Sequence, residues 1–428
     1  MKPQRVVILF DSHTPYLAFR VNALQRELVR RGLTPHVELH VILTGANWSS
    51  YGWDAQSLQE KYEVPLHVLT KEFHGLGLRS FFSTSLPKIF FNLALLFFRL
   101  RPRVTLTGGY DRPASLFCRL LSYFFFGKVG VMNDSRFNDA ESFNRNATLE
   151  FIKSLVVARY SFFMCSGQES ADYHRFLGGK NKPIFTEAWD VVDNDGISQA
   201  ADDTSHDAKI YQSFGLKPGS RYFFFPTRFI PKKNVPFVLR AYAAYLEELG
   251  ENHDQAQPLV LCGQGPEKDD IHRAIQELSL AGHVKLCDWL PYELMPRACR
   301  LATTLILAST HDQWGMTVNE SLSAGTPVLV SNRCGAHELV LNDINGFTFA
   351  PTDAQHLTAL LLRLHREPEL LARLRREAPP SMCRFSITQY VERHLQLFGL
   401  YGLLPADASQ EDHRASQSMP FPKANTSP

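Results

Sequence analysis

The sequence predicts an α/β protein built from two doubly wound domains, each with a parallel sheet, that face each other across a cleft. Short apolar runs alternate with helical patterns along most of the chain, which is typical of β-α-β units. The alternation stops in a segment rich in Asp, Ser and Gly, and then starts again. A chain of 428 residues, 44% of them hydrophobic, is long enough for two separate cores. Ligands of such sheets bind beyond the carboxyl ends of the strands, so the cleft is the expected site.

The first domain is expected over residues 1–195. Its strands are predicted at 5–10, 37–43, 104–109, 128–133 and 160–166. Its helices are predicted near 17–31, 86–99, 112–124, 144–157 and 168–177. The alternation favours a sheet in which successive strands run parallel.

The second domain is expected over residues 221–380, after an interdomain segment at 196–220. Its strands are predicted at 221–228, 258–263, 284–289, 303–309, 327–331 and 346–350, with helices near 234–248 and 355–375. A last helix near 387–399, within the segment 381–404, is expected to pack back on the first domain. The polar, Pro-rich residues 405–428 are expected to be disordered.

Composition and charge narrow the range of partners. The 45 Lys and Arg residues against 43 Asp and Glu residues give a formal net charge of +2, so nothing in the overall charge indicates nucleic acid. The seven cysteines show no C-x-x-C or Cys/His metal spacing, which favours reduced thiols in a cytoplasmic protein. The first apolar run is too short for a signal peptide. We therefore expect a cytoplasmic protein without a metal site.

The Phe-rich segment 79–103 contains the longest apolar stretch. Asn92 interrupts this stretch and Arg99 and Arg101 close it, so it is too short to span a bilayer. One interpretation is a helix packed on the first sheet. The other is a helix lying on the inner face of a membrane, because Lys88 and the arginines flank Phe and Leu. We favour the packed helix, because apolar helices in such folds normally belong to the core.

Two loops at predicted strand ends could hold an anion. The loop "RFIPKKN" at 228–234 follows the first strand of the second domain, so Arg228 and Lys233 are expected to point into the cleft, where positive charge suits a diphosphate. The alternative is a solvated basic loop. In "CGQGP", Gly263 and Gly265 would let backbone N–H groups approach an anion, although a purely structural turn would use the same glycines.

The stretch "HDQWGMTVNESLSAGTPVLV" at 311–330 gives the strongest signal. Asp312 precedes a turn at Gly315, and a helix beginning near Thr317 would present free N–H groups to a phosphate. Glu320 can accept hydrogen bonds from both hydroxyls of a ribose. The structural alternative is that Asp312 caps the helix and Glu320 only favours its dipole. Two carboxylates beside a diphosphate require nearby cations, so the three loops are most consistent as one site.

Through these segments, the second half of the chain resembles the nucleotide-sugar domain of the retaining glycosyltransferases of family 4, the glycosyl transferases group 1. Members of that family have the GT-B fold of two Rossmann-like domains. The matching segments are "RFIPKKN", "CGQGP", "DQWGMTVNESLSAGTPVLVSNRCGAHELV" and "NGFTFAPTD", in the family's order. They cover most of residues 221–355.

The resemblance implies roles for individual residues. Arg228 and Lys233 would bind the donor diphosphate, and Glu320 would hold the nucleotide ribose. Asp312 would contact the donor sugar, at a position where the family usually has Glu. Backbone amides of Gly315, Met316 and Thr317 would cradle the phosphate and the sugar.

The first half resembles the acceptor domain of the family through "TGGYDRPASL", "VMNDSRF" and "CSGQESADYHRFLG". The glycine pair that often follows the first strand is replaced by "FDSHTPY". Asn133 and Asp134 occupy the place from which many relatives reach the donor sugar across the cleft. An ordinary Asx turn is the alternative for "NDS".

The resemblance implies a retaining, metal-independent hexosyltransferase with no cofactor beyond its donor, a nucleoside diphosphate sugar. The acceptor would be a hydroxyl of a sugar, a lipid-linked glycan or another molecule in surface glycan or polysaccharide assembly. The cations and the helix N-terminus would stabilise the departing phosphate. Two alternatives remain open. One is an epimerase or hydrolase of nucleotide sugars on the same fold. The other is a non-catalytic binding subunit, because Asp312 replaces Glu.

Overall fold

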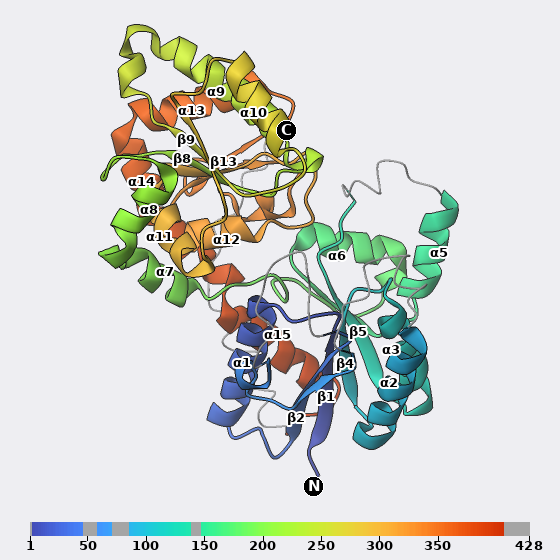
Figure 1. Cartoon of the computed structure of the whole chain (residues 1–428). Coiled ribbons are helices and arrows are strands. Elements are labelled where there is room, and N and C mark those ends of the chain that lie inside the picture. The colour runs from blue at the N-terminus through green and yellow to red at the C-terminus, as the bar shows by residue number, and fades with distance from the viewer. Residues whose placement is uncertain (1, 46–57, 71–84, 138–146, 406–428) are drawn as a thin grey trace.

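The structure, a computed structural model, describes residues 2–45, 58–70, 85–137 and 147–405. Figure 1 shows two α/β domains, each built around one sheet. The N-terminal sheet has seven strands in the order β3-β2-β1-β4-β5-β6-β7, and the C-terminal sheet has six in the order β10-β9-β8-β11-β12-β13. Neighbouring strands pair in parallel in both sheets. In each sheet the strand order reverses beside the first strand, so the predicted doubly wound, two-domain fold is confirmed.

The elements of the N-terminal domain follow the predicted alternation. The strands are β1 (Gln4–Phe10), β2 (Val37–Leu43), β3 (Leu66–Val68), β4 (Val104–Gly108), β5 (Lys128–Asn133), β6 (Phe162–Cys165) and β7 (Ile184–Phe185). The helices are α1 (Pro15–Arg30), α2 (Leu86–Leu100), α3 (Pro113–Phe124), α5 (Ala147–Val157) and α6 (Gln168–His174). The edge strands β3 and β7 were not predicted, because runs of three and two residues show no alternation.

The C-terminal domain contains β8 (Phe223–Pro226), β9 (Leu259–Cys262), β10 (Val284–Cys287), β11 (Thr304–Leu307), β12 (Val328–Ser331) and β13 (Gly346–Phe349). Its helices are α7 (Asn194–Asp202), α8 (Asp207–Phe214), α9 (Val235–Leu249), α10 (Lys268–Glu277), α11 (Met295–Leu301), α12 (Met316–Ser323), α13 (Ala354–Arg366) and α14 (Pro368–Ser381). The helix predicted near 355–375 is two helices, α13 and α14. The break falls at Glu367, which is not helical, because the proline ring that follows disfavours helical backbone at the preceding residue.

Residues 196–220, expected to link the domains, differ from that expectation. They are largely helical, in α7 and α8, and Ile197, Ile210 and Phe214 are buried in the core of the C-terminal domain. Part of the polar composition around this segment serves the helices themselves, because the carboxylate of Asp193 caps α7 by accepting the N–H of Gly196. The segment is therefore part of the second domain.

The chain passes between the domains twice, between β7 and α7 and between α14 and α15 (Ile387–Leu400). Helix α15 lies beside α1 in Figure 1, and its Tyr390 and Phe398 are buried in the N-terminal core. The two passages are pinned together where Asn194 Nδ2 donates to the carbonyls of Met382 at 3.2 Å and Phe385 at 3.3 Å. Of the tail predicted to be disordered, residues 406–428 lie outside the described residues.

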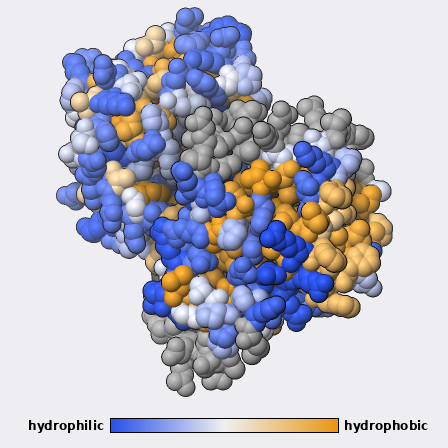
Figure 2. All heavy atoms as spheres, turned by 60° about the horizontal axis from the view of Figure 1, so that its bottom comes forward, coloured by the Kyte–Doolittle hydropathy of each residue, from blue (hydrophilic) through white to orange (hydrophobic). Residues whose placement is uncertain are grey.

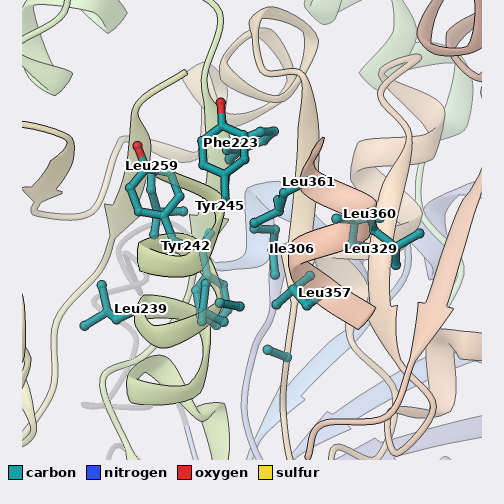
Figure 3. Packing of buried hydrophobic residues seen from close by; sticks show 14 of the residues in the cluster. Phe223, Leu239, Tyr242, Tyr245, Leu259, Ile306, Leu329, Leu357, Leu360 and Leu361 are labelled. Atoms are coloured by element: carbon teal, nitrogen blue, oxygen red, sulfur yellow. The ribbon is translucent and has the colours of Figure 1, made fainter. Parts of the chain in front are cut away.

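Apolar side chains cover both faces of the C-terminal sheet. In Figure 3, Tyr242 and Tyr245 of α9 and Leu357 of α13 pack against strand residues such as Phe223 and Ile306. This packing fixes the strands whose carboxyl ends carry the predicted site. All seven cysteines are free thiols. Across the described ranges, no helix combines the length and apolar character needed to span a bilayer.

Candidate active site

The carboxyl ends of the two sheets face each other. Tyr16, which follows β1, donates a hydrogen bond of 2.6 Å to Oε1 of Glu320, which lies in α12 beyond β11. Arg136, which follows β5, lies 3.5 Å from the carbonyl oxygen of Asp312. The residues predicted to bind a donor therefore lie where the two domains meet, as expected for ligands of doubly wound sheets.

Asp312 is held by two lysines of the "RFIPKKN" loop. Its Oδ2 forms an ion pair with Lys233, and its Oδ1 lies 3.1 Å from Nζ of Lys232. Burial disfavours ionisation of Asp312, but the two lysines outweigh burial and lower its pKa to about 2. The structure thus brings two of the predicted site residues, Lys233 and Asp312, into direct contact, and Asp312 carries its charge at neutral pH.

Arg228 is half-buried beyond the carboxyl end of β8, five positions before Lys233 on the same loop. The two predicted glycines pack against this loop. A Cβ atom on Gly263 would lie 1.9 Å from the carbonyl oxygen of Thr227, and one on Gly265 would lie 2.3 Å from that of Phe229. The glycines are thus required by the close approach of two backbones, the structural role that the sequence left as an alternative. That approach also places the Gly263 turn beside Arg228.

Gly263→Ala should therefore lower the free energy of unfolding by about 1–3 kcal/mol, because the new methyl group must push the Arg228 loop away. Urea unfolding followed by intrinsic tryptophan fluorescence would measure the change. Gly282→Ala is the matched control, since a Cβ there meets nothing within 4 Å. Equal stabilities of the two variants would contradict the close-approach argument.

Helix α12 begins at Met316, one position before the predicted start. Gly315 caps it with a φ of 117°, a left-handed conformation that favours glycine, and an added Cβ would clash with Leu307 at 2.6 Å. The first N–H groups of a helix have no partner within the helix, so those of Met316 and Thr317 are available to an anion. They follow directly on the loop that carries Asp312.

Glu320 is buried, and phenols surround its carboxylate. Tyr16 donates to it from the N-terminal domain, and the side chain of Tyr292 bonds to it from the C-terminal domain. Burial raises the pKa of Glu320, and the two phenols oppose that rise only in part. The carboxylate that was predicted to grip a ribose thus binds a side chain of the other domain in this structure.

Asn133 and Asp134, the residues of the N-terminal domain expected to reach the donor sugar, have different partners in the structure. Asn133 Oδ1 accepts the backbone N–H of Ser135, which is the Asx turn named as the alternative. Asp134 is close enough to the buried guanidinium of Arg20 to influence its ionisation. Arg20 Nη2 in turn lies 3.6 Å from Asp190 and 3.9 Å from Sδ of Met316, at the start of α12.

Several residues at this junction were not predicted. Lys232 and Arg136 lie within segments singled out in the sequence, so their charge was a usable signal. Tyr16 also lies in a quoted segment, "FDSHTPY", but nothing in that segment indicated its contact with Glu320. Arg20 and Tyr292 lie outside the segments singled out in the sequence. In the ranges that the structure describes, no three His, Cys, Asp or Glu side chains are grouped so that they could hold a metal ion.

Residues 207–380, which start in α8 and carry all three site loops, match the family model described as glycosyl transferases group 1. This stretch is therefore similar to the glycosyl transferases group 1 domain. The match begins inside the segment expected to link the domains, in agreement with the packing of α8.

Solved structures similar to the whole chain support the GT-B fold. HepE of Anabaena, in complex with UDP and glucose, aligns over 92% of this chain and 99% of its own with a TM-score of 0.70 and 17% identity. Sucrose-phosphate synthase of Thermosynechococcus elongatus aligns over 93% and 98% with a TM-score of 0.71 and 15% identity. The predicted fold of two Rossmann-like domains is confirmed.

Curated relatives match the chain over shorter stretches. Alpha-D-kanosaminyltransferase of Streptomyces kanamyceticus is 24% identical over 47% of this chain and 50% of its own length. O-antigen chain mannosyltransferase B of Escherichia coli is 27% identical over 31% of this chain and 34% of its own. The chain thus spans about half or less of the curated relatives that it matches.

Proposed function

We propose that the chain is a retaining glycosyltransferase that moves a sugar from a nucleoside diphosphate sugar to an acceptor hydroxyl, without a metal, in glycan or polysaccharide assembly. The observation that carries this proposal is the meeting of Lys232 and Lys233 with Asp312 directly before the N-terminus of α12. Lysine charges beside free helix N–H groups form a site for a diphosphate. The glycosyltransferase names of the relatives support the same class.

The charges of the loop fit a leaving diphosphate. Arg228, Lys232 and Lys233 supply three positive charges, of which Asp312 neutralises one. The remainder, with the amides of α12, would stabilise the negative charge that develops as the bond between C1 of the sugar and the diphosphate oxygen breaks. Asp312, oriented by the lysines, would contact the donor sugar.

Retention follows if the acceptor oxygen attacks C1 from the face that the diphosphate leaves. The new C1–O bond then forms on the same side as the old one breaks, and the acceptor proton passes to the departing diphosphate. No protein nucleophile is needed in this scheme. The acceptor would approach from the N-terminal domain, on the side of Asn133 and Asp134.

The donor would carry uridine diphosphate. This part of the proposal draws on the complexes of HepE with UDP, with UDP and glucose, and with UDP-glucose. A thermal-shift screen of nucleoside diphosphates and their sugars tests it, because a ligand that binds only the folded state raises the melting temperature. A screen in which no nucleotide raises the melting temperature would overturn the proposal.

Product analysis then separates the alternative functions. Release of free sugar without an acceptor would identify a hydrolase, and conversion of the donor into another nucleotide sugar would identify an epimerase. Donor binding without turnover would identify a binding subunit.

Tyr16→Phe should tighten binding of the nucleotide by about 2–10-fold, because the substitution removes the hydroxyl that competes with the ribose for Glu320. The lost hydrogen bond contributes about 0.5–1.5 kcal/mol, which corresponds to that change in affinity. Isothermal titration with the nucleoside diphosphate found in the screen measures it. Tyr123→Phe, which removes an exposed hydroxyl on α3, is the control. Unchanged or weaker binding in the Tyr16 variant would show that the phenol and the ribose do not compete.

A further inference from the structure

Helices α2 and α3 present a second apolar face that the protein core does not use. We call it the α2–α3 apolar surface, formed by the exposed side chains of Phe91, Leu95, Phe98, Leu120, Tyr123 and Phe124. Phe91 and Tyr123 are 70% and 71% exposed. Large apolar side chains scattered singly on a surface are ordinary, but a contiguous group of this kind marks an interaction site.

The spacing shows that this face is continuous along each helix. In α2 the exposed residues follow one another at i, i+4 and i+7, and in α3 at i, i+3 and i+4, so each set forms one stripe. The opposite face of α2 is also apolar, because Ile89, Leu93 and Phe97 are buried in the core. Helix α2 therefore buries one apolar face in its own domain and leaves another apolar face at the surface.

The two stripes form a single surface because α2 and α3 lie side by side. The rings of Phe90 and Phe117 stack between them with centroids 4.4 Å apart, and Phe98 meets Phe125 edge-on at 6.4 Å. Figure 2 shows hydrophobic atoms over a broad area of the N-terminal domain, on the side where α2 and α3 lie in Figure 1. Phe126, in the turn after α3, is 82% exposed and extends the surface.

Helix α5 also exposes apolar side chains. Phe151, Ile152 and Leu155 of α5 are exposed. Arg119 of α3 donates to the carbonyl oxygen of Arg159, two residues beyond the end of α5, so this end of α5 lies near α3. Three helices of this domain thus turn large apolar side chains outward.

The same region is strongly basic. Residues 86–128, from α2 to the start of β5, contain seven Lys and Arg residues and a single acid, Asp111. The exposed basic residues are Lys88, Arg99, Arg101, Arg103 and Lys128. Apolar side chains that enter a bilayer interface, flanked by basic residues that pair with anionic headgroups, are the combination that holds peripheral proteins on membranes.

We propose that the α2–α3 apolar surface docks on a membrane surface that carries anionic lipids. Phe91, Phe98 and Tyr123 enter the headgroup region, and the basic residues around them contact lipid phosphates. The helices lie along the interface without crossing the bilayer. This docking requires no donor, so it stands or fails separately from the proposed sugar transfer.

Co-sedimentation of the full chain with vesicles tests the docking. The protein should sediment with vesicles that contain phosphatidylglycerol, should stay in solution with vesicles of phosphatidylcholine alone, and should be released as the salt concentration rises. The triple change Phe91→Ser, Leu95→Ser, Phe98→Ser should weaken binding by at least about tenfold. The double change Lys88→Glu, Arg103→Glu should weaken it by about tenfold or more.

Matched controls use the other domain. Leu341→Ser with Ile344→Ser removes exposed apolar side chains there, and Arg240→Glu with Arg373→Glu reverses exposed charges there. Both controls should bind vesicles as the parent protein does. All substituted side chains are exposed, and circular dichroism checks that each variant is folded.

Three results would overturn the inference. One is equal binding to both kinds of vesicle, and another is equal loss in the controls. The third is a failure of the folded parent protein to bind either kind. If light scattering then shows a dimer that the triple change abolishes, the surface belongs to a contact with a second copy of this chain.

Discussion

Arg228→Ala should lower the rate of sugar transfer by about two to three orders of magnitude, or about 2–4 kcal/mol, the usual effect of removing one group that stabilises developing charge. The guanidinium lies on the loop that the Gly263 turn supports, and Lys232 and Lys233 already share Asp312. Arg228 adds a third positive charge to this loop. Donor binding should change less than turnover, because the charge on the diphosphate grows as the bond breaks.

Initial rates of donor consumption with saturating acceptor would measure the effect, with donor affinity determined separately by titration. Arg228→Lys should recover part of the rate, since it keeps the charge and loses the bidentate geometry. Arg240→Ala, an exposed arginine on α9, is the control and should be fully active. An Arg228→Ala protein as active as the parent would rule out the proposed role of this loop.

Glu320→Ala should weaken binding of a nucleoside diphosphate by about 10–100-fold, the range expected for hydrogen bonds to a charged group of about 1.5–3 kcal/mol. The two hydroxyls of the ribose would lose the carboxylate oxygens of Glu320, which accept their hydrogen bonds in the proposed complex. The experiment becomes specific when the ligand is changed as well. A 2′,3′-dideoxynucleoside diphosphate lacks the two hydroxyls, so the substitution should not weaken its binding.

Titration of parent and variant with both ligands gives the coupling between Glu320 and the ribose. Glu320→Gln, which retains an acceptor oxygen, should fall between the parent and Glu320→Ala. If the substitution weakened binding of the dideoxynucleotide as much as that of the nucleotide, the effect would come from disturbed packing of α12, and the ribose role would be wrong.

Local patterns in the sequence predicted most of the fold, because strand and helix periodicity are properties of neighbouring residues. The runs that became β1, β5 and β11 each contain four consecutive buried residues. The errors were also local in origin. Pro368 separated α13 from α14, and capping by Asp193 made a polar stretch helical where composition indicated a linker.

The site was predictable only where loops of one sheet carried it. Chain order placed Lys233, Asp312 and Gly315 at strand ends of one sheet, and parallel topology then placed them together. The contact between Tyr16 and Glu320 joins residues 304 positions apart in different domains. Its geometry depends on how two sheets are oriented toward each other, which no local pattern encodes.

The two passages of the chain between the domains, pinned side by side by Asn194, limit how the halves of the molecule can move. A body held at two neighbouring points is free to swing about the line that joins them, while twisting and sliding strain both attachments. Separation of Tyr16 from Glu320 would then follow an arc about that axis. Substrates would enter at the rim farthest from the pivot, and the same swing that admits the nucleotide would widen the path for the acceptor.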